Sequence, residues 1–81
     1  MAGRLKGGDT MGKFAENLAS YRMQRKISQE ELAKRVGVSQ AAIAQYETGA
    51  AVPRLYVTVK IANALSIKID DLVNGKEAHN A

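Results

Sequence analysis

The chain has 81 residues, of which 46% are hydrophobic, with a net charge of +4, one proline and no cysteine. This length suits one domain with a modest core, and it excludes a large internal active-site cavity. Without cysteine, neither disulfides nor thiolate–metal bonds can stabilise the fold, so packed apolar side chains must do so. The single proline and the few aromatic residues favour helices over strands.

The positive charge lies entirely in the N-terminal part of the chain. Residues 1–35 contain eight basic and four acidic residues, whereas the rest is balanced. This asymmetry suits a nucleic-acid partner, but a solvated basic face without a partner explains it equally well. No apolar run approaches the roughly 18 residues of a membrane span, and residues 1–9 lack the apolar run of a secretory signal. We therefore expect a cytoplasmic protein with no membrane partner.

The first predicted helix covers residues 13–26. Residues 1–12 contain four glycines and no apolar periodicity, which predicts a flexible tail. From there on, side chains recur at helical spacing along one stripe: Phe14, Leu18, Tyr21, Arg22 and Arg25. Apart from Arg22, the basic run that ends this helix is predicted to be solvated and to complement the helix dipole.

The second predicted helix begins after Ser28. Ser28 and Glu31 match the capping box, in which each side chain satisfies a backbone N–H at the start of the helix. Gly37 is suited to end this helix because glycine readily adopts a left-handed conformation. One residue then separates Gly37 from Ser39, which is a good N-cap for a third helix. Two helices joined so tightly must cross at a steep angle.

Gly49 is suited to close the third helix, and Pro53 to open a fourth. The predicted inner stripe of the fourth helix is Leu55, Thr58, Ile61, Ala62 and Leu65. A short fifth helix is predicted for residues 69–74, with two aspartates in its first turn and Gly75 at its end. The predicted all-α chain consists of a tail (1–12), a domain (13–75) and a second flexible tail (76–81).

Residues 29–49, QEELAKRVGVSQAAIAQYETG, have the helix-turn-helix pattern. A small alanine stands where the two helices must approach closely, and a glycine makes the turn. Together with Arg22, Pro53 and the sequence KIANAL, this segment resembles the phage repressor and Cro family, also called the xenobiotic-response-element (XRE) family. The resemblance covers about residues 13–74 and extends over all five predicted helices.

The resemblance implies a compact, lambda-repressor-like five-helix domain. In that family the third helix lies in the major groove of double-stranded DNA, usually as a homodimer on a two-fold symmetric operator. The residues favour the same helix independently, because glutamine can contact adenine through two hydrogen bonds and alanine can touch the thymine methyl. The alternative is an alanine-rich surface helix with incidental glutamines. The predicted DNA-binding residues are Gln29, Ser39, Gln40, Ala41, Ala44, Gln45, Thr48 and Arg54.

Similarity to the family suggests individual roles. Gln29 would lie near a phosphate and brace Gln40, and Arg54 would approach the DNA backbone or minor groove. Two departures stand out: residues 50–52 are apolar where many members carry lysine or arginine, and Thr58 replaces a usual leucine. We therefore expect a modest affinity for DNA and less certain packing under the fourth helix.

Two further structural predictions follow. Arg22 and Glu47 lie beside the apolar stripes of their helices, where a charge is tolerated mainly when it is paired, so we expect an ion pair. The same pairing occurs in the resembling family. The fourth and fifth helices also carry more apolar residues than one inner stripe can use, which predicts a homodimer interface. Its residues are Tyr56, Val57, Val59 and Val73, unless some of them fill the core beside Thr58.

No catalytic, metal or cofactor site is predicted. The segment GGDTMGKF at residues 7–14 fits G-x-x-x-x-G-K, but Phe14 occupies the position of the magnesium-binding serine or threonine. His79 is the single histidine, and no nucleophile or base can be assembled around it. We therefore predict a transcriptional regulator and not an enzyme. The alternative is a protein-interaction module or antitoxin on the same scaffold, with a toxin, an effector subunit or RNA polymerase as partner.

Overall fold

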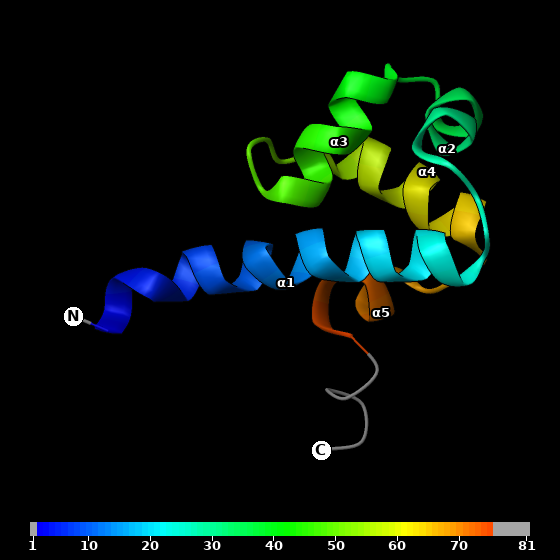
Figure 1. The fold of residues 1–81 in the computed structure, drawn as a ribbon. Coiled ribbons are helices and arrows are strands. Elements are labelled where there is room, and N and C mark those ends of the chain that lie inside the picture. Colours follow the sequence, from blue (N-terminus) through cyan, green and yellow to red (C-terminus); the bar gives the residue numbers. More distant parts are fainter. Residues whose placement is uncertain (1, 76–81) are drawn as a thin grey trace.

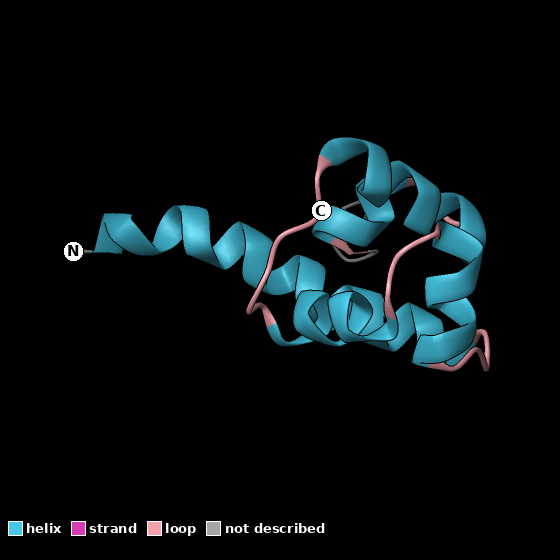
Figure 2. Cartoon of the chain, turned by 90° about the horizontal axis from the view of Figure 1, so that it is seen from above, coloured by secondary structure: helices cyan, strands magenta, loops and turns pink. Residues whose placement is uncertain are grey.

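The computed structural model describes the backbone of residues 2–75 and the side chains of residues 13–75. This part of the chain forms five helices: α1 (Ala2–Gln24), α2 (Gln29–Val36), α3 (Gln40–Thr48), α4 (Leu55–Leu65) and α5 (Ile69–Asn74). Figure 2 shows helices joined by short loops, without a strand in the described residues. In Figure 1, α1 lies between α5 on one side and α3 and α4 on the other. The all-α prediction is confirmed.

The first helix is longer than expected. We placed its start at Lys13, but α1 begins at Ala2. Each glycine in a helix costs only about 1 kcal/mol relative to alanine, and extending an existing helix is far easier than nucleating one. The first turns of α1 project beyond the other helices (Figure 1). Residues 7–13, which fit the phosphate-loop pattern, therefore lie in a helix, whereas the domain boundary at residue 13 stays a prediction.

Local chemistry determines the ends of α2. The Ser28 hydroxyl accepts a hydrogen bond from the Glu31 N–H at 3.0 Å, as the capping box requires. The reciprocal bond expected from Glu31 is not formed, because its carboxylate instead accepts from Arg35 Nε at 3.1 Å, one turn later. Gly37 ends the helix in a left-handed conformation with φ 86°, and its N–H donates to the Ala33 carbonyl.

Every described helix contributes to one apolar core. Its buried members are Phe14, Leu18, Tyr21, Leu32, Ala33, Val36, Ile43, Val57, Ile61, Ala62, Leu65 and Leu72. Ile43 is fully buried and is the residue through which α3 is anchored in this core. The other residues of α3 are half-buried or exposed, and Tyr46 packs against the edge of the core.

The start of α4 differs from the predicted stripe. Leu55 was expected inside but is 74% exposed, whereas Val57 was expected in a dimer interface but is 6% exposed. Val57 precedes Ile61 by four residues and therefore lies on the same helical face. Thr58 is also buried, and its hydroxyl donates to the Arg54 carbonyl at 3.2 Å, which satisfies the polar group. The alternative interpretation, core filling beside Thr58, therefore holds for Val57.

Two polar side chains, one in α1 and one directly after it, donate to backbone carbonyls of α5 and α4. Arg25 Nε donates to the Leu65 carbonyl at 2.7 Å, at the C-terminal end of α4. Asn17 Nδ2 donates to the Leu72 carbonyl in α5 at 2.9 Å. Arg25 was predicted to be part of a solvated helix end; it is exposed, as are Gln24 and Lys26, and the bond to Leu65 is an additional contact. A long-range contact of this kind has no signature in the local sequence pattern.

Candidate nucleic-acid interface

Helix α3 has one buried side and one open side. It begins after Ser39, whose hydroxyl accepts from the Ala42 N–H at 3.0 Å, and it ends at Gly49, which has a φ of 85°. Ala41 and Gln45, both predicted to contact bases, lie on the side of α3 away from Ile43, and Gln40 is the first residue of the helix. Gln40, Ala41 and Gln45 are exposed, and Ala44 is half-buried. None of these four side chains carries a charge.

The turn before α3 is short. Residues 37–39 are the whole connection between α2 and α3, and the left-handed Gly37 reverses the chain direction within it. Val38 N–H donates to the Ala33 carbonyl at 3.0 Å, which holds the turn against the end of α2. The two helices are therefore positioned together as one helix-turn-helix unit.

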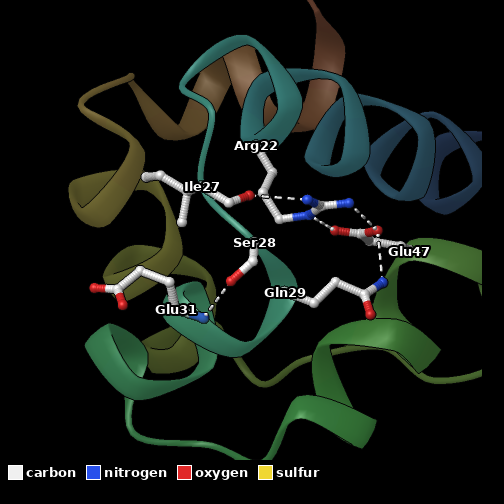
Figure 3. Close-up of polar contacts among 6 residues, drawn as sticks. All are labelled: Arg22, Ile27, Ser28, Gln29, Glu31 and Glu47. Atoms are coloured by element: carbon white, nitrogen blue, oxygen red, sulfur yellow. Dashed lines mark hydrogen bonds and ion pairs between the residues drawn. The ribbon is translucent and has the colours of Figure 1, made fainter.

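Arg22 of α1 and Glu47 of α3 form an ion pair under this unit (Figure 3). Arg22 Nε lies 2.6 Å from Glu47 Oε2, and Nη2 lies 3.2 Å from Oε1. The Arg22 Nη1 group donates to the Ile27 carbonyl at 2.9 Å, in the connection to α2. The two side chains are 15% and 8% exposed. Through these three hydrogen bonds, Arg22 of α1 is joined both to α3 and to the loop before α2.

Gln29 also belongs to this cluster. Its Nε2 donates to Glu47 Oε1 at 3.0 Å, rather than to Gln40 as the family resemblance suggested (Figure 3). Reasoning from the sequence missed this bond. The available signal was the spare acceptor capacity of a buried carboxylate, which has about four lone-pair sites. Gln29 is thus held at the beginning of α2 by a residue near the end of α3.

The loop after α3 is organised by Thr48. This residue was predicted to face DNA and is exposed, but its hydroxyl donates to the Gln45 carbonyl at 3.1 Å and accepts from the Ala50 N–H at 3.3 Å. Arg54 follows the loop as the N-cap of α4 and is exposed. Within the apolar part of the loop, Val52 is 58% exposed.

The residues predicted for the dimer interface fall into three environments. Tyr56 is 62% exposed, with Lys60 Nζ 5.7 Å from its ring centre. Val59 and Val73 are half-buried, and Val57 is in the core. Leu55, which was not predicted for this surface, is exposed beside Tyr56.

Metal sites and membrane-spanning helices are both missing from the part of the chain that the structure describes. There, no group of three or more histidine, cysteine, aspartate or glutamate side chains is arranged to hold a metal ion. None of the described helices is both long and apolar enough to cross a membrane. His79 lies outside the described residues.

Comparison with known proteins defines the class. The helix-turn-helix family model HTH_3 matches residues 18–72. The chain is 33% identical over 63 residues to an uncharacterised HTH-type transcriptional regulator, YqaE of Bacillus subtilis, covering 78% of this chain and 54% of the relative. It is 38% identical over 60 residues to the cryptic phage CTXphi transcriptional repressor RstR of Vibrio cholerae, covering 74% and 54%.

A solved structure has the same fold. The P22 c2 repressor protein, crystallised with a synthetic operator, superimposes with a TM-score of 0.74 at 33% identity, over 78% of this chain and 96% of that one. The fold and the open α3 face define a helix-turn-helix DNA-binding domain of the lambda-repressor-like type. The chain belongs to the helix-turn-helix family of phage-repressor and Cro type, whose members are transcriptional regulators and not enzymes. It spans about half the length of the curated relatives YqaE and RstR.

Proposed function

We propose that this chain binds a short operator in double-stranded DNA through the outer face of α3 and regulates transcription in the cytoplasm. The observation that carries this proposal is the α3 face itself. Gln40, Ala41 and Gln45 are exposed there, while Ile43 and the paired Glu47 hold the helix in the domain. An exposed helix face with short, uncharged side chains fits closely against base edges in the major groove.

The proposal divides the DNA contacts by chemistry. Gln40 and Gln45 offer amides that can bind adenine through two hydrogen bonds, and Ala41 and Ala44 offer methyl groups to thymine. Contacts of this kind carry the sequence preference. Arg54, exposed at the start of α4, supplies a cation for the phosphate backbone, which contributes affinity without sequence preference. The hydroxyls of Ser39 and Thr48 cap the two ends of α3 and keep its face in position.

We further propose a homodimer on a two-fold symmetric operator. The P22 c2 repressor, which has this fold, was crystallised with operator DNA. The surface proposed here for contact between two copies includes the exposed Tyr56 and Leu55 and the half-buried Val59 and Val73. Exposed apolar side chains that lie together on a small protein often indicate an association surface.

The same exposed apolar residues favour a second candidate function. Val52 and Leu55 are 58% and 74% exposed, in a loop and helix start where a DNA-facing surface ordinarily carries cations. A protein partner, such as a toxin or an effector subunit, would cover them. In this case the chain is a protein-interaction module on the helix-turn-helix scaffold.

One experiment distinguishes the two functions. Sequences bound by the chain are selected from random duplex DNA, and the selected sequence is titrated at several salt concentrations. A symmetric consensus, bound in preference to random DNA, supports the operator-binding function. Failure to obtain a consensus at low salt, together with a stoichiometric complex with another protein, supports the interaction module instead.

A further inference from the structure

We propose that the depression between α2 and α4 is a second binding surface, and that it takes an acidic segment of another protein. It is lined by Arg35 at the end of α2 and by Lys60, Asn63 and Ala64 of α4. The depression is open to solvent and has a volume of about 370 Å³. None of the residues predicted to contact DNA lines it. The proposal therefore does not depend on the proposed binding of DNA.

The two cations of this depression keep hydrogen-bond donors that the fold does not use. Lys60 forms no ion pair with any residue that the structure describes, and its Nζ lies 5.7 Å from the centre of the Tyr56 ring, within the range of a cation–π contact. Arg35 gives its Nε to Glu31 Oε2 at 3.1 Å, so both of its terminal NH2 groups remain available. An anionic group in the depression therefore has two cations beside it.

The charge pattern of the two helices favours an acidic occupant. Lys60 is the single charged residue of α4, and the Glu31 carboxylate in α2 is already paired with Arg35. Among the residues predicted to contact DNA, by contrast, only Arg54 is charged. The positive charge of the chain is thus not confined to the proposed DNA contacts. Cations without a partner attract acidic partners and raise their rate of association.

The other two lining residues favour a protein segment over a phosphate backbone. Asn63 and Ala64 follow Lys60 by three and four positions and therefore lie on the same face of α4. Asn63 is exposed and offers an amide, whereas Ala64 is half-buried and offers a methyl group. A segment with both carboxylates and aliphatic side chains can use the cations, the amide and the methyl group together. A phosphate backbone has no apolar group for Ala64.

The test uses the whole chain labelled with ¹⁵N and a synthetic amphipathic peptide that carries glutamate and leucine at helical spacing. This peptide should shift the amide resonances of the four lining residues, and it should bind more weakly as the salt concentration rises. A control peptide with glutamine in place of every glutamate should bind at least about tenfold more weakly, because two exposed ion pairs are lost. Absence of any shift, shifts centred on α3, or equal binding of the two peptides overturns the proposal. Random duplex DNA that shifts the same four resonances also overturns it.

Two double variants with the same net charge separate the site from the charge of the whole chain. Arg35→Gln/Lys60→Gln should weaken binding of the acidic peptide by about tenfold, or about threefold for each exposed ion pair lost. Lys34→Gln/Lys68→Gln removes two exposed lysines outside the depression and should leave the affinity within about twofold. Equal losses overturn the proposal. All four positions are exposed, so both variants should fold, which urea unfolding checks. A chain that selects no operator but binds the peptide at this surface refutes only the proposed DNA binding.

Discussion

Leu55 and Val57 lie two residues apart at the start of α4 and have opposite environments, 74% and 6% exposed. Val57→Ala should lower the free energy of unfolding by about 2 kcal/mol, because two buried methyl-sized groups are lost and a small cavity remains. Leu55→Ala should change it by less than about 0.5 kcal/mol. Urea unfolding of both variants measures the difference. Equal effects would show that this turn of α4 does not have the orientation described.

Removing one partner of the Arg22–Glu47 pair should be strongly destabilising. Glu47→Ala leaves the arginine charge in a largely buried position, which costs roughly 3–5 kcal/mol. Glu31→Ala is a suitable control, because the Glu31–Arg35 pair is about half exposed on both sides, and exposed pairs contribute 0–1 kcal/mol or so. Thermal unfolding of the two variants provides the comparison. An unchanged melting temperature for Glu47→Ala would show that the pair contributes nothing.

The proposed base contacts should be separable from the backbone contact. Gln40→Ala or Gln45→Ala should weaken binding to the selected operator by roughly 1–3 kcal/mol and leave binding to random DNA nearly unchanged. Gln24→Ala removes an exposed glutamine from α1 and is the control. If both α3 variants bind the operator as the unaltered chain does, α3 does not recognise bases.

Arg54→Ala should behave differently from the glutamine variants. The loss of one phosphate contact weakens all duplexes by a similar factor, because a phosphate carries no sequence information. The slope of log affinity against log salt concentration should also decrease in magnitude by about one unit, since one fewer counterion is released. Titrations at four or five salt concentrations measure this slope. A loss restricted to the operator would instead assign Arg54 to base recognition.

Stability should decrease at alkaline pH through Tyr21. Burial raises the pKa of its hydroxyl above the ordinary 10.0, the nearby Asp71 carboxylate raises it further, and Arg25 opposes the shift. The folded state thus holds this proton more tightly than the unfolded state. Its contribution is fully present below about pH 10 and is lost as the pH rises toward the folded-state pKa. The stability of the unaltered chain should accordingly fall relative to Tyr21→Phe above pH 10, and a pH-independent difference would contradict this.

Much of the fold was predictable because helix ends depend on local chemistry. Ser28, Ser39, Gly37 and Gly49 were each assigned as helix caps from neighbouring residues alone, and each has that role in the structure. The open face of α3 was predictable from helical periodicity. At 3.6 residues per turn, Ala41 and Gln45 point away from the buried Ile43.

What could not be predicted depends on contacts distant in sequence. The Gln29–Glu47 bond joins residues 18 positions apart, and the Arg25–Leu65 bond joins residues 40 apart. The rotation of α4 that buries Val57 and exposes Leu55 is likewise determined by the helices against which it packs. Periodicity defines a stripe of residues, but it does not determine where the centre of that stripe lies at the first turn of a helix.

The outward side chains of α3 have a consequence for how such domains diversify. Gln40, Ala41 and Gln45 take part in no described side-chain hydrogen bond or ion pair, and all three are exposed. Exchanging them should leave the unfolding free energy within about 0.5 kcal/mol of its value, as is usual for surface positions. A new operator preference can therefore arise by one or two substitutions without a compensating change in the core. Thr48 is the exception on this helix, because its hydroxyl holds the following loop and constrains what can replace it.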